Sequence, residues 1–489
     1  MEVEYRTHLT AVLDVTCFLL RQGLPFCGHD ESLSSLNKGN FHELLEWYSL
    51  RNDKVFRVVN QNDPANNQMT SSKIQKELAN ACATKITCAI VDDIGDKYFS
   101  LMIDETQDVS VKEQMGVVLR YVSKNGYVIE SFLAMVHVPD TSVISLKNAI
   151  DCLFAKHRLS LSRLRGQGYD GASNMRGEFN GLKALVLKEN PYARYIHCFA
   201  HQLQLVIVDV AKDNRIVSDF FQYVTMIVNA AGALAKGKNN FGNITMTGNT
   251  IPVPNMEDHM RIRGRSRREG QVITHFHHYR IEIFCEVIDL IAQEMQNRFP
   301  ETSTELLLLL SCLDPRDSFS KFNIHKLLRL AELYPEDFTM TERMMLEDQL
   351  ATFIYDVRHD PDFINVGELG GFARKMVETG KHIIFPLIYL LIELALVLPI
   401  VTASVERVFS AMNIVKTDLC NKMGDEWMND SLVVYIEREV FATIDNEAIL
   451  QRFQKMQTRR MQLPPLSLTH MPHISSTNAG IGSSSSMHK

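Results

Sequence analysis

Three β-rich runs joined by short links limit the possible folds of this chain more than any other feature of its sequence. The runs are YFSLMIDET (98–106), QMGVVLRYV (114–122) and GYVIESFLAMVHVP (126–139). They are rich in β-branched and aromatic residues, and polar or glycine-containing links separate them, as is typical of successive antiparallel strands. We therefore predict a sheet that begins with three antiparallel strands.

The segments after these runs alternate between helix and strand. Residues 143–157 are predicted to be helical, and LRGQGYDGASNM (164–175) contains a short extended run that ends at Asp170 in a glycine-rich turn. A helix at 176–189 and a short strand running into a helix within 194–211 follow. The resulting order βββαβαβα is that of the ribonuclease H-like fold, a mixed sheet flanked by helices. The predicted fold class is therefore α/β (mixed α+β).

The remaining sequence is predicted to be mostly helical, so that a helical insertion interrupts the sheet. The predicted parts are a helical N-terminal region (1–95), the first part of the ribonuclease H-like fold (96–212), a shortened helical insertion with a long loop (213–384), a helical C-terminal region (385–457) and a disordered tail rich in Ser and Pro (458–489).

Composition and charge exclude several classes of protein. The net charge of -7 and the isoelectric point near 6.2 argue against nucleic-acid binding by bulk charge, so any such binding must be local. The nine cysteines include no C-x-x-C pair, which indicates a reducing compartment rather than a disulfide framework. The acidic start of the chain argues against a secretory signal. The apolar run IIFPLIYLLIELALVLP (383–399) contains Pro386, Tyr389 and Glu393, which favour a buried helix over a membrane span.

Three acids are candidates for a metal site. Asp104 ends the first predicted strand and Asp170 ends the fourth, and these strands are neighbours in the ribonuclease H-like topology. Glu406 lies in VTASVERVFSAM (401–412), beside an apolar helix face made of Val405, Val408, Phe409 and Met412. Converging carboxylates can bind two divalent cations, Mg²⁺ or Mn²⁺, which activate the attacking oxygen and stabilise the leaving oxygen in phosphodiester chemistry.

Ordinary structural roles remain open for each of these acids. An isolated aspartate at the end of a strand commonly caps the strand or forms a turn. Glu406 could instead form a structural ion pair with Arg407 or with another buried arginine.

Several ordered blocks of the sequence resemble those of the hAT transposase superfamily. The blocks are SLMIDET, QGYDGASNM, CFAHQLQL and TASVERVFSAM, and MNDSLVVYIEREVF follows them near the C-terminus. Within this superfamily the sequence resembles plant proteins described as TTF-type zinc finger proteins with a hAT dimerisation region, or as zinc finger MYM-type-like. FLLRQGLPFCGHDES and NKGNFHELLEW resemble the domain of unknown function that precedes the catalytic fold in that group. The resemblance extends over most of residues 15–230 and 257–442.

The resemblance implies roles for individual residues. Asp104, Asp170 and Glu406 match the catalytic acids of the family, which would bind Mg²⁺ or Mn²⁺ in an active enzyme. Cys198 and His201 match its C-x-x-H element next to the active site. Two such ligands are fewer than the four that structural zinc normally takes, so their residue types alone favour a packing role. The region after Ile383 matches the part with which the family completes its catalytic fold and associates with another subunit.

The sequence also departs from the family pattern. Relatives usually begin with a zinc-bearing DNA-binding module, whereas this sequence starts almost directly at the domain behind it. Relatives also carry a long helical insertion that opens with a Thr-Arg-Trp element. The only tryptophans here are Trp47 and Trp427, which lie elsewhere, so the Thr-Arg-Trp element is missing. The sequence between Ala231 and Ile251 has the pattern of a deletion bridged by a loop. These departures predict that catalysis is lost or weak.

Two further surfaces are candidates for binding. RIRGRSRR (261–268) could contact phosphates or act as a nuclear import signal through Arg261, Arg263, Arg265, Arg267 and Arg268. A solvated loop is the alternative. The C-terminal helices present apolar residues that could form a dimer interface or could pack within their own fold: Phe409, Leu432, Tyr435 and Ile436.

The sequence thus predicts a hAT transposase-derived nuclear protein that forms a homodimer or higher oligomer through its C-terminal region. The alternative is an active DDE-type transposase that cuts and joins DNA with two divalent metal ions. A remnant of a mobile element without a selected function is a third possibility. No membrane or small-molecule substrate is expected, and DNA is a possible partner.

Overall fold

The computed structural model describes residues 2–32, 34–61, 69–169, 181–226 without 216, 220, 223 and 224, 255–261, 272–298, 301–364, 366–417 and 420–459. The chain forms two compact units. One unit comprises Met1–Lys85 and Arg438–Lys489, and the other comprises Ile86–Glu437.

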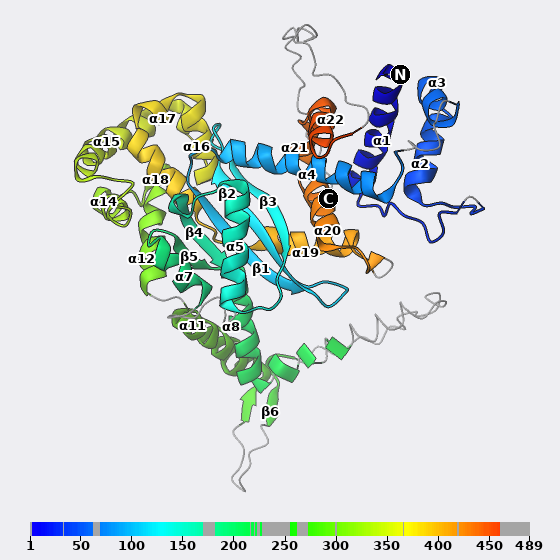
Figure 1. Cartoon of the computed structure of the whole chain (residues 1–489). Coiled ribbons are helices and arrows are strands. Elements are labelled where there is room, and N and C mark those ends of the chain that lie inside the picture. The colour runs from blue at the N-terminus through cyan, green and yellow to red at the C-terminus, as the bar shows by residue number, and fades with distance from the viewer. Residues whose placement is uncertain are drawn as a thin grey trace. The chain divides into compact units, whose positions relative to one another are not determined.

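The first unit is helical where it is described, as predicted for the N-terminal region. Its elements are α1 (Glu2–Gln22), α2 (Asn40–Ser49), α3 (Asp53–Phe56), η1 (Arg57–Gln61), the beginning of α4 (Ser72–Ile94), α21 (Arg438–Ala442) and α22 (Asn446–Lys455) (Figure 1). Leu9, Val12 and Leu13 on α1 are completely buried. Arg6 forms an ion pair with Glu447 at 2.5 Å, which joins α1 to α22. Segments from both ends of the chain therefore build one unit.

The second unit contains a five-stranded mixed sheet. Its strands are β1 (Phe99–Gln107), β2 (Glu113–Val122), β3 (Val128–His137), β4 (Leu164–Tyr169) and β5 (Arg194–His197). The spatial order is β3-β2-β1-β4-β5; the first three strands pair antiparallel, and β1, β4 and β5 pair parallel. This arrangement confirms the predicted ribonuclease H-like fold. The middle strands are buried on both faces, which explains their nearly continuous apolar sequence.

Different elements cover the two faces of this sheet. Helix α5 (Val143–His157) packs on one face, where Phe154 lies 5.9 Å from Phe99 between ring centroids. Figure 1 shows α5 in front of the strands. Because side chains alternate along a strand, Ser100 and Asp104 project to the opposite face. In the sequence, helix α7 (Leu182–Glu189) lies between β4 and β5, and helix α8 (Phe199–Asp213) follows β5.

Three glycines lie on the face opposite α5, and another part of the chain packs directly onto them. A Cβ atom at Gly168 would lie 2.9 Å from Cβ and Cγ of Pro399, and one at Gly166 would lie 2.8 Å from Cδ of Pro399. A Cβ at Gly116 would lie 3.1 Å from Cγ1 of Val405 and 3.2 Å from Cε1 of Phe409. Pro399 and helix α19 (Ala403–Val415) therefore rest against the backbone of the sheet at these three glycines. We call this side of the sheet the glycine-lined face.

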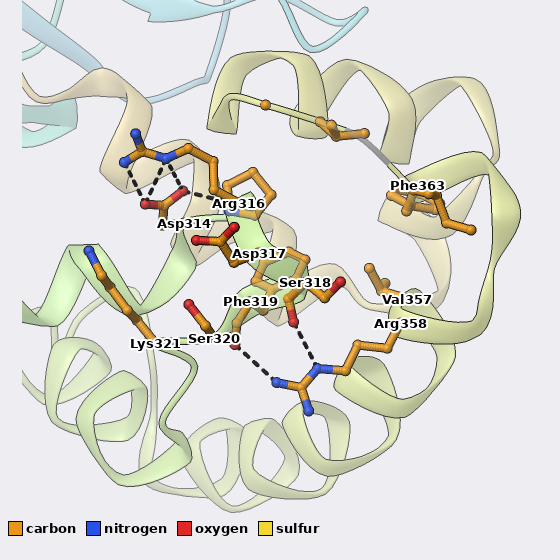
Figure 2. Close-up of a pocket in the computed structure, with 14 residues that line it drawn as sticks. Asp314, Arg316, Asp317, Ser318, Phe319, Ser320, Lys321, Val357, Arg358 and Phe363 are labelled. Carbon is orange, nitrogen blue, oxygen red and sulfur yellow. Dashed lines mark hydrogen bonds and ion pairs between the residues drawn. The ribbon is translucent and has the colours of Figure 1, made fainter.

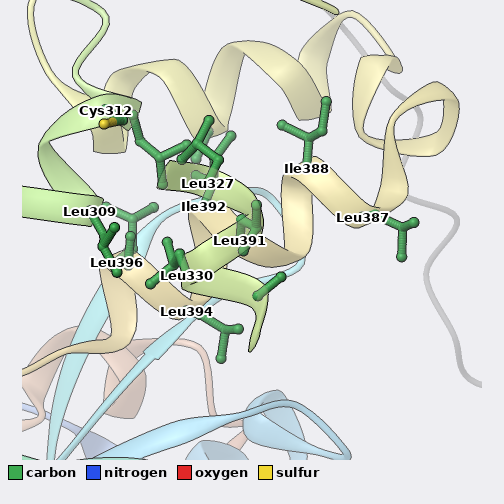
Figure 3. Packing of buried hydrophobic residues seen from close by; sticks show 14 of the residues in the cluster. Leu309, Cys312, Leu327, Leu330, Leu387, Ile388, Leu391, Ile392, Leu394 and Leu396 are labelled. Atoms are coloured by element: carbon green, nitrogen blue, oxygen red, sulfur yellow. The ribbon is translucent and has the colours of Figure 1, made fainter. Parts of the chain in front are cut away.

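The part between the sheet and α19 is largely helical in its described residues, as predicted. Its elements are β6 (His259–Arg261), β7 (Val272–Thr274), α10 (His275–His277), η3 (His278–Cys285), α11 (Glu286–Arg298), α12 (Glu301–Leu310), η4 (Ser311–Leu313), α13 (Arg316–Phe319), α14 (Ile324–Glu332), α15 (Met340–His359), η5 (Pro361–Phe363), α16 (Leu369–Glu378), α17 (Lys381–Ile384) and α18 (Pro386–Val397). Figure 3 shows the apolar cluster that joins α12, α14 and α18. The predicted loop at 231–251 lies outside the described residues.

Helix α18 is a core helix, in agreement with the interpretation of its apolar sequence. Ile388, Leu391 and Ile392 are at most 1% exposed. Burial raises the pKa of Glu393 on this helix to about 7, against the opposing effect of the Lys97 charge. Within the described residues, none of the helices has the length and apolar content needed to cross a membrane.

A buried ion pair connects the helical part to the sheet. Arg165 on β4 contacts both carboxylate oxygens of Asp337 at 2.5 Å, and these side chains are 3% and 2% exposed. The hydroxyl of Tyr98 donates to the same carboxylate at 2.7 Å. Removing one partner of such a pair would leave a buried charge without compensation, so the pair fixes how the helices dock.

The glycine-lined face gives a direct test of this packing. We expect Gly168→Ala to lower the free energy of unfolding by about 1–3 kcal/mol, because its methyl group would overlap Pro399. Denaturant unfolding of the full chain measures this change.

Gly370→Ala in α16 is the matched control, because a Cβ at Gly370 has no atom within 4 Å among the described residues. There the loss of backbone freedom in the unfolded chain predicts no loss of stability, or a gain of about 0.5–1 kcal/mol. Equal effects of the two substitutions would contradict close packing at Pro399.

Candidate active site on the glycine-lined face

Asp104 projects from β1 toward α19. It is half-buried, and its Oδ1 accepts a hydrogen bond from the backbone N–H of Glu105 at 2.9 Å. Its antiparallel partner on β2 is Gly116. Directly paired residues project to the same face, with Cβ positions about 5 Å apart. Since Val405 and Phe409 of α19 pack on Gly116, Asp104 lies on the face that α19 covers.

Glu406 lies in the first turn of α19, next to the residue that packs on the sheet. Val405 is completely buried, whereas Glu406 is exposed, so its carboxylate is at the margin of this contact. Within the described part of the chain, its side chain has no hydrogen-bond or ion-pair partner. Arg407 does not pair with Glu406; it donates to Oγ of Ser404 at 2.6 Å and lies 4.0 Å from Glu130.

The third candidate acid, Asp170, lies outside the described residues. Strand β4 ends at Tyr169, immediately before it in the sequence, and Gly168 pairs in parallel with Met102 of β1. The structure therefore brings Asp104 and Glu406 to one face of the sheet. A metal-binding role of the three acids stays a prediction.

Cys198 attaches the segment before α19 to the start of α8. Its side chain is completely buried, and its Sγ accepts a hydrogen bond from the backbone N–H of Thr402 at 3.5 Å. The N–H of Phe199 donates to the carbonyl of Ile400 at 3.1 Å. His201 is half-buried, and its ring lies 5.6 Å from that of His197.

No group of three or more His, Cys, Asp or Glu side chains suited to a metal ion occurs among the residues that the structure describes. The burial of Cys198 and its contact with Thr402 are those of a packing residue. The role of Cys198 and His201 beside an active site remains a prediction.

A second buried ion pair, which no pattern in the sequence indicated, attaches the far end of α19. Lys416 donates to Oδ2 of Asp108 at 2.7 Å, and both side chains are 1% exposed. Burial raises the pKa of Asp108, but hydrogen bonds from Lys416, Ser110 and Gln114 outweigh burial and hold this pKa below its usual value. The two residues are 308 positions apart, so no local pattern links them.

Helix α20 (Asp425–Ile436) runs along the edge strand β3. The N–H of Met135 donates to Oδ1 of Asn429 at 2.9 Å, and the N–H of Phe132 donates to Oε1 of Glu437 at 2.6 Å. These side chains satisfy backbone groups of an edge that would otherwise be open to pairing with another chain.

The four candidate dimerisation residues differ in accessibility. Leu432 on α20 is completely buried within the chain. Phe409, Tyr435 and Ile436 are half-buried. The structure thus supports packing within the fold for Leu432, and dimerisation stays a prediction for the residues that retain exposed surface.

The arginine-rich segment is largely outside the described residues. Arg261 ends β6, and four arginines fall in the part that is not described: Arg263, Arg265, Arg267 and Arg268. Phosphate contact or nuclear import through this segment remains a prediction.

Asp104 and Glu406 do not line either of two cavities in the described part of the second unit. One of about 620 Å³ lies in the helical part, where Arg358 donates to the carbonyls of Ser318 and Phe319 (Figure 2). The other, of about 510 Å³, lies between β3, α5 and the beginning of α20.

Part of the chain is similar to known proteins. Residues 1–181 match the model of a family described as the ZMYM1/FAM200, RNase-like domain. The human protein named "52 kDa repressor of the inhibitor of the protein kinase" is 23% identical over 209 residues, 42% of this chain and 27% of the relative. Its mouse counterpart is 23% identical over 202 residues, 40% of this chain and 26% of the relative.

The matches thus span about a quarter of the length of these relatives. The family match ends after β4, so β5 and α19 lie beyond it. Residues 1–181 are therefore similar to a ZMYM1/FAM200-type, RNase-like domain, in agreement with the zinc finger MYM-type part of the resemblance seen in the sequence.

Proposed function

We propose that this chain is a hAT transposase-derived nuclear protein that associates with another copy of itself through its C-terminal region. In this proposal the ribonuclease H-like sheet serves mainly as a scaffold, and catalysis is lost or weak. The observation that supports the lineage most is the sheet order β3-β2-β1-β4-β5 with Asp104 and the Glu406 helix on one face. The match of residues 1–181 to an RNase-like domain supports the same lineage.

The names of the human and mouse relatives support a regulatory role. Both are called a repressor of the inhibitor of a protein kinase. A repressor acts by binding partners, which requires a folded scaffold and an interaction surface but no strand cleavage. A repressor role for this chain would be consistent with action in the nucleus.

The accessible side of α20 supports self-association. One side of this helix caps β3 through Asn429 and buries Leu432. Tyr435 and Ile436 near its end remain half-buried and can lose further surface against a second copy. Burial of apolar surface contributes roughly 25 cal/mol per Å² to such an association.

An active transposase is the second candidate function. Asp104 and Glu406 share one face of the sheet, and Glu406 is exposed without a side-chain partner among the described residues. With Asp170, these carboxylates are the donor type that Mg²⁺ or Mn²⁺ prefers. When bound, two such ions would supply activation of an attacking oxygen and stabilisation of a leaving oxygen. The chain's own contribution would be to hold the carboxylates in place.

Self-association is tested by the charge substitution Tyr435→Glu in the full chain. We expect the wild type to sediment as a dimer or larger species at micromolar concentration. We expect Tyr435→Glu to weaken self-association by about tenfold or more, because a carboxylate in an apolar contact must be desolvated.

Tyr355→Glu is the control, because Tyr355 is 71% exposed on α15, outside the C-terminal region. A wild type that sediments as a monomer would contradict the proposal. Loss of folding in Tyr435→Glu alone would show that this residue packs within its own fold.

Catalysis is tested by nicking of supercoiled plasmid DNA with Mn²⁺. The proposal predicts that the full chain nicks DNA little or no faster than Asp104→Ala and Glu406→Ala. Glu426→Ala, which removes an exposed acid at the beginning of α20, is the control. Nicking that disappears in both site variants but persists in Glu426→Ala would establish the transposase-like alternative.

A further inference from the structure

An ion pair on the glycine-lined face lies directly beside the first turn of α19. Arg120 of β2 and Glu130 of β3 are cross-strand partners, and Arg120 donates from Nη1 to Oε1 of Glu130. Both side chains are 21% exposed. Charge-assisted hydrogen bonds of this kind are stronger than neutral ones when water is partly excluded.

This pair contacts the chain on both sides of residues 398–402. Arg120 donates from Nε to the carbonyl of Leu396 in the last turn of α18, at 2.7 Å. Oε2 of Glu130 accepts a hydrogen bond from the hydroxyl of Ser404, in the first turn of α19. Arg407 approaches Glu130 to 4.0 Å and donates to the same hydroxyl at 2.6 Å. The pair therefore joins the sheet to the end of one helix and the start of the next.

These contacts set the rotation of α19 about its own axis. Ser404 and Arg407 are three residues apart and so lie on the same side of the helix. Each residue of an α-helix is rotated by about 100° from the previous one, so fixing Ser404 and Arg407 also fixes the direction of Glu406 between them. Apolar packing of Val405, Val408 and Met412 is less directional than these hydrogen bonds, which specify the orientation of the first turn.

We propose that Glu130 is a positioning residue for Glu406. Its carboxylate holds Arg120 with one oxygen and Ser404 with the other, and thereby holds the first turn of α19 in one orientation. The contacts of Glu130 with Arg120 and Ser404 do not involve a metal. Their importance for a metal site rests on the alternative function proposed for Asp104 and Glu406.

The chemistry of the contact explains why glutamate is needed. Alanine removes both acceptors. Glutamine keeps one oxygen acceptor for Arg120, but its amide group can only donate to Ser404, so it reverses one hydrogen bond and removes the charge. We therefore expect graded effects, with Glu130→Gln intermediate between the wild type and Glu130→Ala.

Hydrogen exchange in the full chain tests the positioning role. In Glu130→Ala we expect backbone amides of residues 405–409 to exchange at least about tenfold faster than in the wild type, since a hydrogen bond to a charged group is lost. Amides of α5, on the other face of the sheet, should keep their rates. Glu130→Gln should give a smaller increase, and Ser404→Ala should add little to Glu130→Ala because the two residues share one contact.

Glu347→Ala, an exposed glutamate on α15, is the control. Unchanged exchange at 405–409 in Glu130→Ala, or an equal increase throughout the chain, would overturn the proposal. If Glu130→Ala does not fold, the comparison between Glu130→Gln and Glu347→Gln decides in the same way.

A measurement of Mn²⁺ binding tests the positioning role of Glu130 separately from the transposase alternative. If the wild type binds Mn²⁺ through Asp104 and Glu406, Glu130→Ala should weaken binding by about fivefold or more at an unchanged unfolding midpoint, and Glu130→Gln should restore part of it. Unchanged affinity would overturn the positioning role. If the wild type binds no Mn²⁺, the transposase alternative fails, and the exchange rates alone decide on Glu130.

Discussion

The second unit depends on three glycines on one face of its sheet. Gly116, Gly166 and Gly168 let Pro399 and α19 approach the strands so closely that added Cβ atoms would overlap them. Close-packed interiors tolerate little change in volume, so this contact defines where the C-terminal helices can dock. As a result, a segment that follows residue 398 covers a sheet whose first strand begins at Phe99.

Polar contacts select one way of packing the helices on this face of the sheet. Arg165–Asp337 fixes the helical part, Lys416–Asp108 fixes the end of α19, and Glu130 fixes its beginning. Buried ion pairs of this kind add little net stability, because desolvation offsets much of the attraction. Their partners must nevertheless meet, so they disfavour other ways of packing the same helices. Specific pairing and close packing together account for the shared face of Asp104 and Glu406.

The sequence predicted the sheet because its pattern is local. The β-rich runs and the short links between them identify β1, β2 and β3. Asp104 was predicted to end the first strand, but β1 continues to Gln107, so Asp104 lies within the strand. The apolar spacing of α19 correctly indicated that Val405 faces the core while Glu406 lies beside it.

Long-range features escaped prediction for physical reasons. The pairing of Asp108 with Lys416 and the contact of Glu130 with Ser404 join distant residues, so no spacing rule reveals them. A glycine in a strand weakens the local signal, and only the structure shows that Gly168 faces Pro399. Likewise, an apolar stripe on a short helix does not say whether Leu432 faces the core or a partner.

Disulfide trapping measures the docking of α19 most directly. In the full-length double variant Gly116→Cys/Val405→Cys, the sulfur at 405 can take the place of Cγ1 of Val405, 3.1 Å from a Cβ at position 116, which is within reach of a disulfide. Under mild oxidation, mass spectrometry should find a cross-linked peptide joining positions 116 and 405, and Gly116→Cys/Ile414→Cys should not give its counterpart. A folded double variant that forms no 116–405 cross-link would contradict the docking of α19 on the glycine-lined face, and with it the shared face of Asp104 and Glu406.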